Sequence, residues 1–296
     1  MSIKDKKTIV IGTRSSELAR IQADIIANSL KDFFDIKIKT ISTSGDKISG
    51  SLKDIGGKSL FVKEIEHALL EDEIDIAVHS LKDVPAEIPS GLEIAAITKR
   101  EDPREAFLSD HCNNFFDLPK GARIGTSSPR RSSLILAKRP DLEIVPIRGN
   151  VDSRMQKMSR GLCDGLILAL AGLRRLGCES SVRHVFSVDD FVPSVGQGAL
   201  GIEVKKDRSD LIRILREVCN DQESELCIKA ERAYLKAISG DCYTPLGACA
   251  EIVGDQIHIT AYLEINKDRR LVKIKGPKES PEALGIRAAE FLVNNG

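Results

Sequence analysis

The order of apolar and polar positions predicts alternating strands and helices in the first part of the chain. Residues 8–11 (TIVI) form a short apolar run, and residues 36–41 (IKIKTI) alternate apolar with polar side chains. Both patterns are typical of strands. Between them, apolar residues recur at the spacing of an amphipathic helix, at Leu18, Ile21, Ile25, Ile26 and Leu30. This order of elements indicates a mainly parallel α/β sheet.

The same alternation returns after a polar segment. Residues 42–59 are rich in Gly, Ser and Lys and lack apolar periodicity, so we expect a surface loop or lid there. Strands are predicted at 74–78 and 92–97, the second one after a breaker at residues 85–89. A helix should precede the first of these strands, with its apolar face formed by Phe61, Ile65, Ala68 and Leu69.

A second α/β set is predicted from residue 101, and its strand ends are where a ligand should bind. In open α/β sheets, ligands bind beyond the carboxyl ends of strands, close to helix N-termini. The predicted strands are 123–125, 143–147 and 165–169, with helices from Pro129, Val151 and Ala171.

From residue 222 the pattern changes. One helix is predicted to residue 239, followed by strands at 248–253, 256–263 and 271–275 and a helix at 281–293. This order predicts a small α+β third domain.

Composition excludes several classes of protein. The 296 residues contain 44 Lys and Arg against 44 Asp and Glu, with 42% apolar and 4% aromatic residues. At roughly 100 to 200 residues per domain, this length corresponds to two or three domains, and the apolar fraction excludes a disordered chain. A net charge of zero and so few aromatic residues argue against sequence-independent nucleic-acid binding and base stacking.

The chain also lacks the patterns of membrane, secreted and zinc proteins. Its most apolar run, residues 165–173, is far shorter than a membrane span, and the apolar run near the N-terminus is too short for a signal peptide. The seven cysteines are widely spaced and include no C-x-x-C pair, which favours reduced thiols and no metal site. We therefore expect a cytoplasmic protein.

Three familiar motifs fail in their context. Residues 196–201 match the dinucleotide pattern G-x-G-x-x-G, but they precede the strand-like residues 202–204 and do not open a helix. A strand that crosses between domains fits better. Residues 57–59 (GKS) resemble the end of a P-loop, yet Leu52 stands where its first glycine is required. The polar residues of 79–83 (HSLKD) lack the G-x-S-x-G elbow of a hydrolase.

Arginines stand at the predicted strand-to-helix junctions. They are Arg14, Arg130, Arg131, Arg148, Arg154, Arg174 and Arg175. Between residues 125 and 175 there are ten Lys and Arg against four Asp and Glu. The fork of donors in arginine suits carboxylates and phosphates, and the hydroxyls of Thr126, Ser127 and Ser128 add neutral donors. The pattern favours a polyanionic ligand, with a solvated basic face as the alternative.

Eight motifs occur in the order found in one known family. They are TRSSELA, GGKSLFVKEIE, HSLKDVP, GTSSPRR, IRGNVDSR, AGLRRLG, VGQGALGIE and SGDCYTPLGA. The chain resembles the hydroxymethylbilane synthases, also called porphobilinogen deaminases. The resemblance extends from residue 8 to residue 247, and more weakly to the end.

The resemblance implies two α/β domains of the type II periplasmic-binding-protein fold and a small α+β C-terminal domain. Domain 1 would comprise residues 1–100 and 197–220, domain 2 residues 101–196, and domain 3 residues 221–296. The implied reaction joins four porphobilinogen molecules head to tail into the linear tetrapyrrole hydroxymethylbilane, with release of ammonia, in haem biosynthesis. The chain would grow on a dipyrromethane cofactor, from which water releases the product.

The resemblance also assigns the cofactor to Cys242 through a thioether. This cysteine lies in a loop with Gly and Pro (SGDCYTPLG), where a thiolate can be exposed for alkylation. An unreactive buried thiol is the alternative for any single cysteine. The neighbouring Asp241 stands where we expect a small residue in the family, and its charge would raise the pKa of the thiol.

Asp83, in HSLKDVP, matches the catalytic carboxylate of the family. Pyrroles become cationic when the aminomethyl group loses ammonia and again when the new bond forms. A fixed carboxylate stabilises both cations and can also transfer protons. An aspartate that only caps a loop is the alternative.

The other matched positions would bind the acetate and propionate groups of the pyrroles. Besides Cys242, the cofactor-binding set is Lys82, Thr126, Ser127, Ser128, Arg130 and Arg131. The substrate-binding set is Arg14, Ser16, Lys58, Arg148, Arg154 and Arg175. Lys82 could equally be a surface lysine, and Asp46 could be lid structure without a chemical role.

Two other classes of function are alternatives to the transferase. A non-catalytic carboxylate- or oxyanion-binding protein would suit the arginines but gives no reason for Cys242. An effector-binding regulator fits poorly, because no basic helix-turn-helix segment precedes the α/β domains. The family is usually monomeric. We therefore expect a monomer that takes porphobilinogen as its substrate and binds neither nucleic acid nor membrane.

Overall fold

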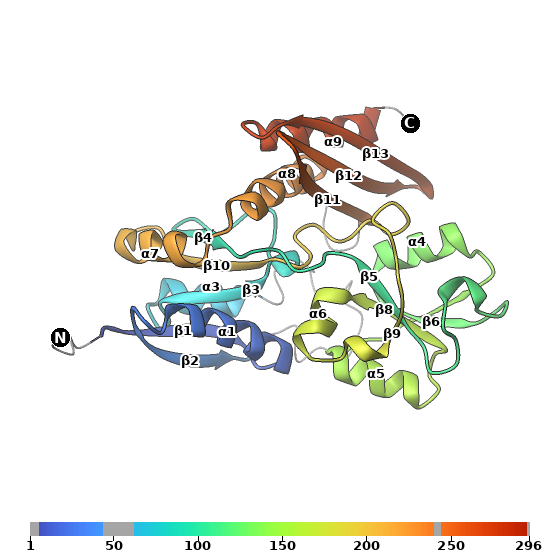
Figure 1. Cartoon of the computed structure of the whole chain (residues 1–296), viewed down its shortest axis with the longest axis horizontal. Coiled ribbons are helices and arrows are strands. Elements are labelled where there is room, and N and C mark those ends of the chain that lie inside the picture. The colour runs from blue at the N-terminus through green and yellow to red at the C-terminus, as the bar shows by residue number, and fades with distance from the viewer. Residues whose placement is uncertain (1–5, 44–61, 240–243, 295–296) are drawn as a thin grey trace. The chain divides into compact units, whose positions relative to one another are not determined.

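The computed structural model describes residues 6–43, 62–239 and 244–294. The chain divides into two compact units, shown with their elements labelled in Figure 1. Unit 1 comprises residues 1–100 and 199–225, and unit 2 comprises residues 101–198 and 226–296. Within the described ranges, no helix has both the length and the apolar character that a membrane crossing requires.

Unit 1 is built on a five-stranded sheet in the order β2-β1-β3-β10-β4. Strand β1 is parallel to β2 and β3, whereas β10 is antiparallel to both of its neighbours. The strands are β1 Thr8–Arg14, β2 Asp35–Ile41, β3 Ile76–Ser80, β4 Leu92–Ile97 and β10 Leu200–Lys205. The helices are α1 Glu17–Leu30, α3 Lys63–Leu70 and α7 Ser209–Cys219, with the 3-10 turn η2 Leu81–Asp83.

Unit 2 contains a second five-stranded sheet in the order β7-β6-β8-β5-β9. Its strands are β5 Glu105–Leu108, β6 Arg123–Gly125, β7 Glu143–Val145, β8 Gly165–Ala169 and β9 Val182–Val185. Its helices are α4 Pro129–Lys138, α5 Val151–Ser159 and α6 Leu170–Arg175, with the 3-10 turns η3 Phe115–Asp117 and η4 Glu179–Ser181. Strand β5 is antiparallel to β8 and β9. The sheet therefore repeats the topology of unit 1, with β5 in the place of β10.

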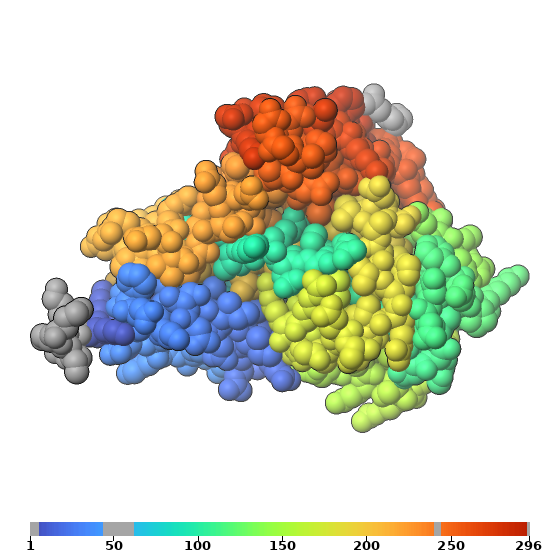
Figure 2. All heavy atoms as spheres, in the orientation of Figure 1, coloured from blue at the N-terminus to red at the C-terminus, as the bar shows by residue number. Residues whose placement is uncertain are grey.

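The C-terminal part of unit 2 is an antiparallel three-stranded sheet with helices. It is formed by α8 Gln222–Ile238 from residue 226 onward, β11 Leu246–Val253, β12 Gln256–Ile265, β13 Asp268–Pro277 and α9 Pro281–Asn294. The apolar core between sheet and helices includes Tyr234, Ile257 and Ala288, all at most 1% exposed. In Figure 2 the red atoms of this part form one continuous surface.

Most elements lie where the apolar pattern predicts them. The predicted strands 92–97, 123–125 and 165–169 coincide with β4, β6 and β8. The strand predicted at 202–204 lies within β10, all of which belongs to the sheet of unit 1. The strand predicted at 74–78 begins two residues later, because Ile74 is a core residue placed beside Gly12 before pairing starts. The two similar α/β sheets and the small α+β part confirm the predicted fold class. The three domain boundaries stay a prediction.

The sequence analysis missed strands β5 and β9 and helix α7. Strand β5 begins with a charged residue, Glu105, and β9 contains Arg183 and His184. Both strands have only four residues, too few to show the longer apolar run or the alternation by which a strand is recognised.

Gly285 is required where α9 contacts α8. A Cβ atom at this position would overlap the carbonyl oxygen of Ala230 and lie 2.8 Å from the backbone nitrogen of Tyr234. We expect Gly285→Ala to lower the free energy of unfolding by about 1 to 3 kcal/mol, because backbone atoms cannot yield as side chains do.

Urea unfolding measures this change. The same substitution in an unpacked helix stabilises by about 0.5 to 1 kcal/mol. A stabilised Gly285→Ala protein would therefore show that the two helices do not approach this closely. Ala283→Gly, on the exposed side of α9, is the control and should cost about 1 kcal/mol.

Candidate functional site

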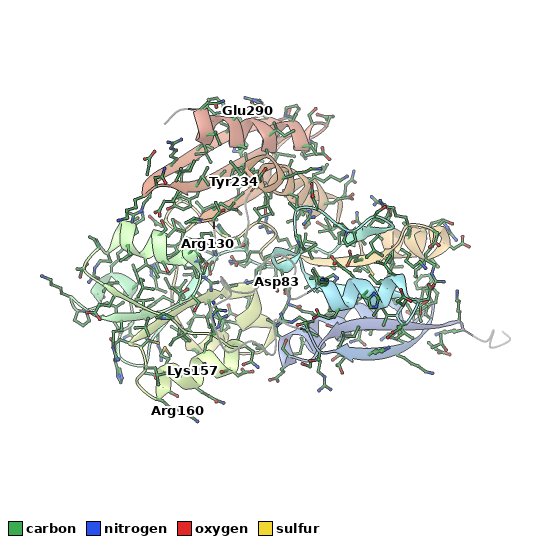
Figure 3. The ribbon with its side chains drawn as sticks, turned by 180° about the vertical axis from the view of Figure 1, so that it is seen from behind. Asp83, Arg130, Lys157, Arg160, Tyr234 and Glu290 are labelled. Atoms are coloured by element: carbon green, nitrogen blue, oxygen red, sulfur yellow. The ribbon has the colours of Figure 1, made fainter. Side chains whose placement is uncertain are left out.

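The sheet of unit 1 brings Asp83 and Arg14 together. Arg14 is the last residue of β1, and Asp83 ends the turn η2 that continues the neighbouring parallel strand β3. Arg14 Nη1 lies 3.9 Å from Asp83 Oδ2, and the two side chains are 25% and 35% exposed. Figure 3 labels Asp83 on this turn. The carboxylate is thus held near a positive charge and remains accessible to a ligand.

Two other predicted residues of unit 1 flank this pair in the chain. Ser16 is the N-cap of α1, and its Oγ accepts a hydrogen bond from Ala19 N at 3.4 Å. The cap places the positive end of the helix dipole just after Arg14. Lys82 precedes Asp83 in η2 and is partly buried.

In unit 2, Arg130 and Arg131 surround one buried carboxylate. Arg130 Nη2 donates to Glu105 Oε1 at 2.5 Å, and Arg131 Nη2 donates to Glu105 Oε2 at 2.8 Å. Arg131 Nε also donates to Oε1, at 3.1 Å, and Arg130 Nη1 donates to Val192 O at 2.7 Å. Glu105 is fully buried, and each guanidinium side chain is only 7% exposed.

These three residues, the arginine group, carry a net positive charge. Two guanidiniums share a single carboxylate, so one positive charge is left over. Burial lowers the pKa of Arg130, and the charge of Glu105 opposes this shift. A nearly buried site with excess positive charge favours an anionic ligand, whose charge would replace the lost solvation.

The hydroxyls that precede α4 are engaged in local hydrogen bonds. Ser128 is the N-cap of α4 and accepts from Arg131 N at 3.4 Å. Thr126 Oγ1 accepts from Ser128 N at 3.1 Å, and Ser127 Oγ donates to Ile147 O at 3.1 Å. These bonds fix the turn between β6 and α4, and with it the start of the helix that carries both arginines.

Arg148 and Arg154 lie around the start of α5. Arg148 is partly buried in the loop after β7, and Arg154 lies in the first turns of the helix. Arg154 Nε donates to Gly149 O at 2.7 Å, and the N-cap Asn150 accepts from Ser153 N at 3.0 Å. The loop and the helix start are therefore tied to each other.

Arg174 and Arg175 have different surroundings although they are adjacent. Arg174 forms ion pairs with Glu101 and Glu179, each at 2.8 Å, so its place in the fold is explained by this network. Arg175 donates from Nη2 to Gly198 O at 2.6 Å, and burial lowers its pKa.

Sequence reasoning missed Glu105. Its only signal is an acidic residue at the start of an otherwise apolar run (EAFL).

Four predicted positions lie outside the described residues: Lys58, Asp46, Asp241 and Cys242. Nearly all of the loop predicted at 42–59 also lies outside them. Among the residues that are described, no three His, Cys, Asp or Glu side chains are placed to hold a metal ion.

Two family models match the chain. The model "porphobilinogen deaminase, dipyromethane cofactor binding domain" matches residues 9–213, and the model "porphobilinogen deaminase, C-terminal domain" matches residues 225–294. The first range includes every candidate residue that the structure describes, and so covers both Asp83 and the arginine group.

Relatives of the same description span the whole chain. The porphobilinogen deaminase of Alkaliphilus metalliredigens is 44% identical over 98% of this chain and 93% of its own length. That of Clostridium acetobutylicum is 45% identical over 97% of this chain and 99% of its own length. Among solved structures, a periplasmic substrate-binding protein of an ABC transporter from Coxiella burnetii is 13% identical, with a TM-score of 0.45. That match covers 71% of this chain and 91% of the other.

The two family models and the two relatives carry the same description and together span nearly the whole chain. The chain belongs to the porphobilinogen deaminase family.

Proposed function

We propose that Asp83 is the catalytic carboxylate of a hydroxymethylbilane synthase, which joins four porphobilinogen molecules head to tail with release of ammonia. The observation that carries this proposal is the placement of Asp83. It lies at the end of β3, is a third exposed, and has Arg14 Nη1 3.9 Å away. A carboxylate in this setting can meet a cationic pyrrole while remaining fixed to the sheet.

The arginine group suits the dipyrromethane cofactor of the family. Dipyrromethane carries acetate and propionate groups, and the excess positive charge of Arg130 and Arg131 is their complement. When bound, the cofactor supplies the free pyrrole α-carbon to which the first substrate is joined. Its holding residues would be Lys82, Thr126, Ser127, Ser128, Arg130 and Arg131, with Cys242 as the attachment point.

Asp83 then has two tasks in each condensation. As the carbon–nitrogen bond of porphobilinogen breaks, ammonia leaves and the substrate becomes a cation that the carboxylate stabilises. After the new carbon–carbon bond forms, the acceptor α-carbon must lose its proton, and the carboxylate can accept it. Arg14 helps to hold the carboxylate in position for both steps.

Each added pyrrole brings two more carboxylates, which require further positive charge. Arg14, Ser16, Lys58, Arg148, Arg154 and Arg175 are the proposed substrate-binding residues. Arg175 and Arg154 each donate a hydrogen bond to a backbone carbonyl, and such a bond orients a guanidinium without neutralising its charge.

We also propose that the protein acts as a monomer in the cytoplasm. The described cysteines support a reducing compartment, because six of them are free thiols. Family membership does not favour the alternative of a non-catalytic carboxylate-binding protein.

Cys242→Ala tests the attachment of the cofactor. The intact mass of the purified wild-type protein, after incubation with porphobilinogen, should exceed the sequence mass by two porphobilinogen units less two ammonias. The variant should show no excess, because it lacks the sulfur that forms the thioether. Cys112→Ala is the matched control and should keep the adduct. An adduct on the Cys242→Ala protein would refute this attachment site.

Asp83→Asn tests the catalytic carboxylate. The variant keeps the shape of the side chain but has no charge to stabilise a cation and no basic oxygen. We expect kcat to fall by about 10² to 10⁴ while the adduct mass is retained. Glu87→Gln, an exposed carboxyl four residues further along the chain, should leave kcat unchanged. Full turnover by Asp83→Asn would rule out the proposed role.

Glu105→Gln tests the arginine group. Without the carboxylate, two nearly buried guanidiniums lose their counter-charge, so we expect the free energy of unfolding to fall by about 3 to 5 kcal/mol. The fraction of protein that carries the adduct should fall as well. Glu105→Asp retains the charge, so its losses of unfolding free energy and of adduct should be smaller. This variant keeps the test usable if Glu105→Gln does not fold. Glu143→Gln, exposed on β7, is the control, and an equal effect there would contradict the prediction.

A further inference from the structure

Unit 1 contains a second group of buried ionisable side chains, Glu66, His79 and Glu203, here called the histidine cluster. His79 Nε2 lies 2.9 Å from Glu203 Oε2, and these side chains are 3% and 0% exposed. Glu66 is 5% exposed. The three residues come from α3, β3 and β10, so the cluster joins a helix to two neighbouring strands of the sheet.

The two carboxyl groups of the cluster are incompletely paired. Glu66 Oε1 and Glu203 Oε1 are both buried and have no hydrogen-bond partner among the described residues. Two ionised carboxylates in this setting would be costly, since both are buried from solvent and His79 lies against only one of them within hydrogen-bonding distance. Burial and the charge of Glu203 raise the pKa of Glu66 to about 7, and His79 opposes this shift. Glu66 thus holds a proton below neutral pH, and Glu203 Oε2 is the carboxylate oxygen that lies against His79.

The cluster adjoins the part of the chain that carries Asp83. His79 lies in β3 one residue before the strand ends, and the turn with Asp83 follows directly. Ser80 exchanges hydrogen bonds with the side chain of Gln22, at 2.8 and 3.1 Å. Leu81 N donates to Ala199 O at 3.0 Å, just before β10 begins. The His79–Glu203 pair therefore ties β3 to β10 close to the point where the chain leaves the sheet for Asp83.

We propose that His79 and Glu203 are positioning residues for Asp83, and that the buried side chain of Glu66 is the third member of their cluster. This inference rests on the proposed role of Asp83. Glu203 accepts the hydrogen of His79 Nε2, which fixes the tautomer and the orientation of the ring. When Glu66 loses its proton, two buried negative charges repel each other between α3 and β10, and the support of β3 weakens.

The direction of the pH dependence follows from the proton on Glu66. Because the pKa of this carboxyl is raised from 4.5 to about 7 in the folded protein, its proton stabilises the fold fully at acidic pH. That stabilisation is lost as the pH rises through about 7. The groups that face Glu66 are Glu203 from β10 and His79 from β3.

The test compares Glu203→Gln with Glu66→Gln, which make the same chemical change at the two carboxyls. We expect Glu203→Gln to lower kcat at least about tenfold with KM changed less than about twofold, because bound substrate meets a misplaced Asp83. The adduct mass should be retained. The Glu66→Gln side chain is uncharged at every pH. Above neutral pH, its kcat and melting temperature should therefore decline less than those of the wild type. Exposed His67→Asn and Glu73→Gln are the controls and should behave as wild type.

A double variant separates positioning from general stability. In the Asp83→Asn background, Glu203→Gln should lower kcat no further, because its effect passes through Asp83. Independent, multiplying losses would overturn the proposal. Equal kcat values and pH profiles for Glu66→Gln and Glu203→Gln would also overturn it. A Glu203→Gln protein with a lower melting temperature but wild-type kcat would do the same.

A spectroscopic measurement keeps this test independent of turnover. The ring nitrogens of His79, assigned by comparison with His79→Asn, should show the Nε2–H tautomer by NMR, and their shifts should change in Glu203→Gln. Unchanged shifts would refute the cluster even if the enzyme is active. If the wild type forms neither adduct nor product while the shifts change as expected, the proposed function fails and the pairing of His79 with Glu203 stands.

Discussion

The interaction on which unit 2 depends is the pairing of buried Glu105 with the guanidiniums of Arg130 and Arg131. Removing two guanidiniums from water is unfavourable unless a carboxylate and good hydrogen bonds replace the solvent. Glu105 supplies that carboxylate from β5, and the turn capped by Ser128 delivers both arginines from α4. Two guanidiniums thus share one carboxylate in the core of this part of the fold.

Unit 1 also buries a glutamate in the strand that corresponds to β5. Strands β5 and β10 occupy the same place in two sheets of equal topology, each antiparallel between two neighbours. Each carries one fully buried glutamate, Glu105 in β5 and Glu203 in β10. Their partners differ, since Glu105 pairs with two arginines and Glu203 with a histidine. The same position in the two sheets thus holds a carboxylate between two arginines in one unit and a carboxylate beside a histidine in the other.

The candidate residues owe their positions to the ends of strands. Arg14 ends β1, Asp83 follows β3, and Thr126 follows β6. Parallel strands end at the same edge of a sheet, so residues distant in sequence meet there without long loops. The caps at Ser16 and Ser128 fix where the next helix begins. The candidate residues therefore stand at the ends of strands and the starts of helices, and their neighbours in the core hold them in place.

Local patterns in the sequence were sufficient for much of this protein. The apolar runs predicted β4, β6 and β8 to the residue, and the arginines at strand ends together with eight ordered motifs indicated the family. Hydrophobic periodicity is readable because it depends on neighbours a few residues apart. The tertiary structure decided what depends on distant partners. Arg131 meets Glu105 across 26 positions and His79 meets Glu203 across 124. No local pattern encodes such pairs, because a buried charge is stabilised only by the partner that the completed fold brings to it.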